Sequence, residues 1–133
     1  MMWILPLPLQ VPKSKSSFFP MNLNEYRNAH YQTLNKAKVN YEILCRELLK
    51  KHKVTRLAGC TLVYTLYVGS AQRRDVANIC SIVDKFFSDA LVKQKIIPDD
   101  DFLCIPEVVY RFGGIDRKDP RVDVEITPYN PSP

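Results

Sequence analysis

The sequence contains little glycine and histidine, and it lacks the motifs of several enzyme classes. Its 133 residues include 4 Gly and 2 His. It has no P-loop, no Gly-x-Gly-x-x-Gly and no Gly-x-Ser-x-Gly. ATP use, dinucleotide binding and serine hydrolysis therefore have no support, and we expect no nucleotide cofactor. His30 and His52 are far apart and lack cysteine partners, so a zinc site is not indicated either.

Long apolar runs are also missing. No segment approaches the roughly 18 apolar residues that span a bilayer. The apolar start, 1–12, is interrupted by three prolines and has no cationic beginning, which makes it a poor signal peptide. We therefore expect a cytoplasmic protein without a membrane partner.

The four cysteines are too widely spaced for a zinc motif or a dense disulfide framework. Each has apolar neighbours in the sequence. We expect buried, reduced thiols at the four positions, which are Cys45, Cys60, Cys80 and Cys104.

Composition and charge indicate one ordinary globular domain with a slight preference for polyanions. Apolar residues make up 46% of the chain and charged residues 25%, which is enough for one core. The 19 Lys and Arg exceed the 14 Asp and Glu, giving a net charge of +5. This excess slightly favours a nucleic-acid partner.

Hydrophobic periodicity predicts a single α+β domain over 1–133, with a small mixed β-sheet and two main helices in β-α-β-α-β-β order. We expect the 60–68 strand to be central, with both faces covered, and a hairpin turn at Gly113-Gly114 that ends near Pro120. The predicted elements are an extended arm or edge strand in 1–19, a helix over Tyr31–Lys50, a strand over Cys60–Val68, a helix ending near Lys95, strands over Leu103–Phe112 and Arg121–Thr127, and a frayed tail over 128–133.

A polar constellation accompanies the second helix. Asp75 lies at its start, Lys85 lies inside it, and the run Asp99-Asp100-Asp101 follows its end. Carboxylates beside a lysine suit metal-assisted phosphodiester hydrolysis, because carboxylates hold Mg²⁺ and the ammonium neutralises phosphate charge. An alternative stays open: Asp75 is a helix cap, the aspartate run is a turn, and Lys85 is a solvated side chain.

The string R-R-D-V-A-N from Arg73, followed by D-K-F-F-S-D-A-L and then D-D at Asp99-Asp100, resembles the RusA family of Holliday junction resolvases. These small endodeoxyribonucleases are common in phages and prophages. The segment Pro20–Tyr31 is similar to the family's N-terminal P-x-x-N-x-x-Y segment. The resemblance covers roughly Pro20 to Thr127.

The resemblance implies a homodimer that binds four-way DNA junctions in a bacterial host cell and nicks two opposing strands with Mg²⁺, for which Mn²⁺ is a possible substitute. It implies that Asp75, Asp99 and Asp100 are catalytic metal ligands. Lys85 would be the catalytic cation at the phosphate, and Asn78 would support the site from the helix start.

Two positions depart from the family pattern. Ala77 stands where the family has a second metal-binding aspartate, and the segment from Asn78 to Lys85 is about one helical turn longer. We expect Asp101 to replace the missing ligand ahead of Asp84, with water as a third option. The departure at Ala77 leaves open a catalytically impaired junction-binding protein of the same fold.

Basic side chains near this constellation are candidates for DNA contacts, because phosphate contacts dominate nucleic-acid affinity. Plain solvated charge is the alternative for most of them. For the aromatic residues Tyr26, His30 and Tyr31 we favour packing over base stacking. The predicted DNA-binding residues are Arg73, Arg74, Asn78, Arg27 and Lys36.

Overall fold

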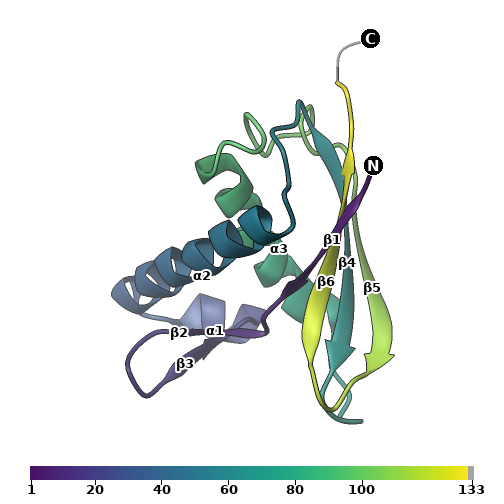
Figure 1. Cartoon of the computed structure of the whole chain (residues 1–133). Coiled ribbons are helices and arrows are strands. Elements are labelled where there is room, and N and C mark those ends of the chain that lie inside the picture. Colours follow the sequence, from purple (N-terminus) through teal and green to yellow (C-terminus); the bar gives the residue numbers. More distant parts are fainter. Residues whose placement is uncertain (132–133) are drawn as a thin grey trace.

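A four-stranded mixed sheet forms one side of the molecule (Figure 1). The computed structural model describes residues 1–131. The strand order is β1-β6-β4-β5, in which β4 pairs in parallel with β5 and antiparallel with β6, and β6 pairs antiparallel with β1. The strands are β1 (Trp3–Leu7), β4 (Cys60–Val68), β5 (Val108–Ile115) and β6 (Arg121–Pro128).

Helices cover one face of this sheet, and the opposite face carries none among the described residues (Figure 1). Alternate β4 side chains, such as Leu62 and Tyr64, are buried beneath the helices, whereas Val63 and Thr65 are half-buried on the open face. The remaining elements are a hairpin of β2 (Gln10–Pro12) and β3 (Phe18–Pro20), the short α1 (Leu23–Asn28), α2 (Tyr31–Lys51) and α3 (Val76–Lys93).

The apolar stripes of the two long helices meet over the sheet. In α2 the buried positions recur at helical spacing, from Ala37 through Tyr41 and Cys45 to Leu49. The Phe86 ring of α3 lies 5.6 Å from the Tyr41 ring, centroid to centroid, in an edge-on contact. One core therefore joins α2, α3 and the covered sheet face.

The α+β class, both long helices and the strand Cys60–Val68 are confirmed. This strand is interior in the sheet as expected, but the expectation that both its faces are covered is wrong, because Val63 and Thr65 are only half-buried on the face that carries no helix among the described residues. The arm in 1–19 supplies the edge strand β1, which pairs with β6. Of the predicted tail, Pro128 belongs to β6 and the Tyr129 N–H donates to the Gly59 carbonyl. The last two residues, 132 and 133, lie outside the described residues.

The predicted hairpin between the last two strands is wrong. β5 and β6 lie on opposite sides of β4, so they do not pair with each other. Gly113 lies within β5 at a bulge, where the register shifts from Leu66 opposite Phe112 to Tyr67 opposite Gly114. A Cβ on Gly113 would lie 2.6 Å from Thr65 Cγ2. Glycine is therefore needed here because the Thr65 side chain lies so close, and not because the chain turns. The strand also begins at Val108, later than predicted.

The cysteine prediction is confirmed in that Cys45, Cys60, Cys80 and Cys104 are free and buried. Burial raises the pKa of Cys45 and Cys80 to about 12 and that of Cys60 to about 11. The thiolate is the reactive form of cysteine. At neutral pH only a very small fraction of each of these three thiols is therefore reactive.

We therefore expect iodoacetamide at pH 8 to label Cys45 and Cys80 at least about a hundredfold more slowly in the native protein than in urea. Peptide mass spectrometry measures each rate, and the same four cysteines in the unfolded chain are the control. Equal native and unfolded rates at Cys45 and Cys80 would contradict the burial described above.

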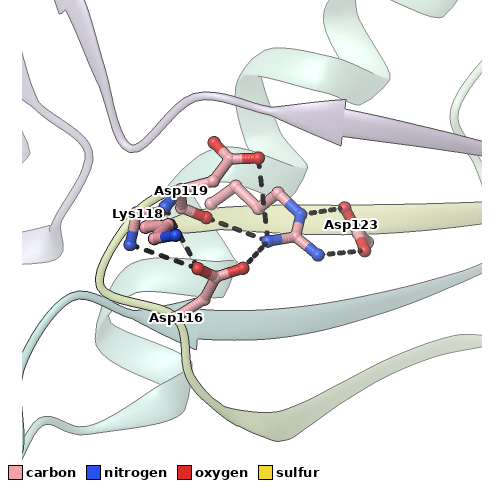
Figure 2. Close-up of polar contacts among 5 residues, drawn as sticks. Asp116, Lys118, Asp119 and Asp123 are labelled. Atoms are coloured by element: carbon pink, nitrogen blue, oxygen red, sulfur yellow. Dashed lines mark hydrogen bonds and ion pairs between the residues drawn. The ribbon is translucent and has the colours of Figure 1, made fainter.

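Arg121, the first residue of β6, holds together the connection that carries the chain from β5 to β6 (Figure 2). Its Nε and Nη2 donate to the two Asp123 carboxylate oxygens, at 2.8 and 3.3 Å, and its Nη1 donates to Asp116 Oδ2 at 2.9 Å. The guanidinium also lies 4.4 Å from the centre of the Tyr67 ring. We call Arg121 with Asp116 and Asp123 the Arg121 clamp. It fixes the connection between β5 and β6 where this connection passes the end of β4.

The clamp predicts an acid-sensitive contribution to stability. The Arg121 hydrogen bond lowers the pKa of Asp116 below its ordinary value of 3.8. Stability from this pair is therefore present above pH 3.8 and is lost as the pH falls through the lowered pKa. We expect Arg121→Gln to lower the melting temperature at pH 7 and the difference from wild type to shrink below pH 3.8, as measured by calorimetry. A pH-independent difference would contradict this.

Candidate functional site

A polar hollow of about 370 Å³ lies between α3, the turn after it and the start of β5. We call it the Asp100 hollow. Its polar lining is Ser81, Asp84, Lys85, Ser88 and Asp89 from α3 together with Asp100. A larger hollow of about 790 Å³ lies against α2 and β1, but its lining is mainly apolar and holds none of the predicted catalytic residues.

Asp84 forms the floor of the Asp100 hollow and is held by three hydroxyl groups. Its Oδ1 accepts from the Tyr64 hydroxyl at 2.8 Å and from Ser88 at 2.9 Å, and its Oδ2 accepts from the Tyr110 hydroxyl at 2.6 Å. Burial, and then the Asp84 carboxylate, raise the pKa of both tyrosines, so they stay protonated as donors. Oδ2 keeps a lone pair that no described group uses.

Asp100 lies on the rim, beside other carboxylates. Its pKa is raised, first by partial desolvation and then by a hydrogen bond to the Asp99 side chain, with the charges of Asp99 and Asp89 adding to the shift. The Asp99 Oδ1 also accepts from the Asp100 N–H at 2.8 Å. A carboxylate whose ionisation is opposed by its neighbours gains from an incoming cation.

Lys85 places a cation on the same rim. The side chain is exposed, and its Nζ lies 5.8 Å from the centre of the Tyr26 ring, as does the Nζ of Lys38. The Tyr26 ring itself packs edge-on against Phe86, with centroids 6.3 Å apart, which confirms packing for this residue. The Lys85 ammonium group thus lies over the Tyr26 ring of α1, and it makes no ion pair among the described residues.

Asp75 lies apart from this hollow. It caps α3, where its Oδ1 accepts from the N–H groups of Ala77 and Asn78 at 3.0 and 3.4 Å. It lines a separate hollow of about 380 Å³ beside Arg73 and Arg74. Ten residues of helix, or about 15 Å along the axis, separate Asp75 from Lys85. The structure therefore brings Lys85 and Asp100 together, but not Asp75.

The sequence placed Asp101 ahead of Asp84 as the replacement ligand, and the structure shows where each of the two side chains lies. Asp101 Oδ1 accepts from the N–H groups of Leu103 and Cys104 at 3.1 and 3.2 Å, so it stabilises its own turn. Asp84 lies in the Asp100 hollow beside Lys85. Asp84 is thus better placed than Asp101 to supply the oxygen that Ala77 cannot.

The hollow suits Mg²⁺ in donor chemistry. Within residues 1–131, no three His, Cys, Asp or Glu side chains are grouped closely enough to enclose a metal ion. Mg²⁺, however, is commonly held by one or two carboxylates, with water and substrate phosphate completing its shell. Asp100 with Asp89 or Asp84 offers such a set, and a metal role for Asp75 and Asp99 stays a prediction.

The predicted DNA-binding residues fall into two groups. Arg73, Arg27 and Lys36 are exposed and make no ion pair among the described residues, so they are available to phosphates. Arg74 folds back onto Ser70 and Gln72, and Asn78 Oδ1 accepts from the Leu23 N–H at 3.2 Å, which joins α3 to α1. The expected packing of His30 and Tyr31 is wrong, because both side chains are exposed and their rings stack only on each other, with centroids 4.9 Å apart.

Sequence reasoning missed the hydroxyl groups that surround Asp84. Tyr64 and Tyr110 come from paired strands, and Ser88 follows Asp84 by one helical turn. The spacing of Asp84 and Ser88 on the helix was the one local signal. The tyrosines join them only because β4 and β5 lie side by side under α3.

Comparison with models of known protein families finds no match, and comparison with curated proteins finds none either. No helix among the described residues is long and apolar enough to cross a membrane.

Proposed function

We propose that this chain is a structure-selective DNA endonuclease, similar to the RusA resolvases, that cuts four-way junctions as a homodimer by Mg²⁺-dependent hydrolysis. One observation carries the proposal. Lys85 and Asp100, which the family-like string singles out, lie far apart in the sequence yet line one polar hollow. A carboxylate that suits Mg²⁺ and a cation that neutralises phosphate charge are groups that serve phosphodiester hydrolysis.

Each side chain has a task in this proposal. Bound Mg²⁺ would polarise the scissile phosphate and activate water. Asp100 would hold the metal together with Asp89 or Asp84, while Tyr64 and Tyr110 keep the Asp84 carboxylate fixed. Lys85 neutralises the negative charge that grows on the phosphate oxygens.

A second candidate is a junction-binding protein that does not cut. It is favoured by Ala77, which brings no carboxylate, and by the position of Asp75 outside the Asp100 hollow. The exposed Arg73, Arg27 and Lys36 would still bind phosphates in this case.

A cleavage assay separates the two candidates. A synthetic four-way junction is compared with linear duplex of the same sequence in Mg²⁺, Mn²⁺ or chelator. Paired nicks confined to the junction support the endonuclease, whereas salt-sensitive binding without nicks supports the second candidate. Neither binding nor cleavage would reject both.

Asp75 is tested separately, because it caps α3 and is also a predicted metal ligand. Asparagine caps helices about as well as aspartate, so Asp75→Asn keeps the cap and removes the charge. We expect an unchanged melting temperature. Loss of cleavage in this variant would assign Asp75 to the chemistry, and full cleavage would leave it only the cap.

A further inference from the structure

The outer edge of β5 is open, and it differs from the other edge of the sheet. In residues 1–131 no strand pairs with that side of β5. The opposite edge strand, β1, contains Pro6 and is followed by Pro8, and proline blocks further pairing because it lacks an N–H. β5 contains neither proline nor lysine, so it carries little protection against pairing.

The hydrogen-bond pattern identifies the free backbone groups. The Leu62 N–H donates to the Glu107 carbonyl at 3.2 Å, and Leu62 lies opposite Val108. In a parallel ladder, residues that bond to the neighbouring strand alternate with residues that point away. Val108, Tyr110 and Phe112 therefore direct their N–H and C=O groups outward.

The length of the usable edge is limited. The bulge at Gly113 bends β5 and interrupts regular pairing beyond Phe112. Val108 and Phe112 are 40% and 55% exposed, which is high for large apolar side chains in a strand. The segment 107–112 is thus a short strand edge with apolar side chains that remain in contact with water.

Charge decides which occupant fits. Glu107 and Arg111 lie on the same side of this segment, on either side of Val109, and neither makes an ion pair within the described part of the chain. When two copies pair antiparallel about Val109, Glu107 of each copy lies opposite Arg111 of the other, and outward-facing Val108 lies opposite outward-facing Tyr110. Pairing about Arg111 would instead oppose two arginines.

We propose that β5 pairs antiparallel with β5 of a second copy, with the two-fold axis at Val109, so that the two sheets join into one. The strand edge and the charges of Glu107 and Arg111 support this interface. It rests on the proposed function in one respect, which is that the proposed function also requires two copies. Val108 lines the Asp100 hollow, so this pairing brings the two hollows close to the two-fold axis. The partner is therefore this chain itself.

A charge exchange tests both the interface and its register. The molar mass of the full chain, without DNA, is measured by sedimentation velocity over a wide range of concentration. We expect Glu107→Lys and Arg111→Glu each to weaken dimerisation at least about tenfold, because two attractive pairs become repulsive. We expect the double variant, Glu107→Lys with Arg111→Glu, to restore it. Arg117→Glu makes the same change of charge outside β5 and should dimerise as wild type.

Val108→Pro tests the backbone part of the interface. The Val108 N–H points outward, so proline removes a donor to the second copy without removing one from the β4 ladder. We expect a monomer whose circular dichroism matches wild type. If this variant unfolds, the charge exchange still decides the proposal.

Other outcomes would overturn the interface. A monomeric wild-type chain would leave this edge to a strand of another protein. A dimer that ignores the charge reversals, or that the double variant does not restore, would place the contact elsewhere. Cleavage is measured independently: junction nicking by a monomer rejects the interface and the homodimer of the proposed function but keeps the endonuclease, and a β5-linked dimer that never nicks rejects only the proposed function.

Discussion

Replacing Asp100 by asparagine is expected to lower junction cleavage by about a hundredfold to a thousandfold while leaving the fold intact. Asp100 is exposed on the rim of the hollow and lines it together with Lys85. Asparagine keeps the size of the side chain but removes the charge that would attract a metal ion. Single-turnover cleavage at saturating Mg²⁺ measures the effect, and thermal unfolding verifies the fold.

Asp101→Asn is the matched control. Asp101 is the next residue, also exposed, but its carboxylate accepts N–H bonds within its own turn and asparagine can take over that role. We expect cleavage within about twofold of wild type, which is too small a change to reflect a lost metal ligand. Equal losses at Asp100 and Asp101 would show that the hollow is wrongly assigned.

Replacing Asp84 by alanine is expected to destabilise the protein by about 3 kcal/mol. The change leaves the hydroxyls of Tyr64, Ser88 and Tyr110 without their acceptor. The Tyr64 side chain is fully buried, so water cannot replace the lost bond there, and each such group costs about 1–3 kcal/mol. Urea denaturation followed by circular dichroism gives the free energy of unfolding.

Two controls surround this prediction. Asp84→Asn retains an acceptor oxygen and should lose about 1 kcal/mol. Asp89→Ala removes a neighbouring carboxylate of α3 that makes no hydrogen bond to a tyrosine, and we expect a change below about 0.5 kcal/mol. If Asp84→Ala were as stable as Asp89→Ala, the hydroxyl groups would contribute nothing to the fold.

Local patterns were sufficient for the long helices and for β4. The apolar spacing from Ala37 to Leu49 and the alternation from Cys60 to Val68 are each contained in one segment, so their periods can be read directly. Strand partners are not local. The glycine pair at Gly113 resembled a hairpin turn because nothing nearby in the sequence shows that β4 lies between β5 and β6.

The candidate site divides in the same way. Lys85 and Asp100 were proposed from sequence, and the turn after α3 brings Asp100 beside the helix. The rank of Asp84 could not be inferred from the sequence, since Tyr64 and Tyr110 reach it from two different strands. The capping bonds of Asp75 and Asp101 depend on backbone geometry at single positions, which spacing does not determine.

The position of β6 has a consequence for how the protein forms during translation. β6 follows β1, β4 and β5 in the sequence, yet it lies between β1 and β4 and, within residues 1–131, is the only strand that joins them. While the ribosome still holds this segment, β1 from the start of the chain has no strand to pair with. The sheet therefore cannot be completed until β6 has left the ribosome, and until then β1 and β4 are exposed to chaperones and to aggregation.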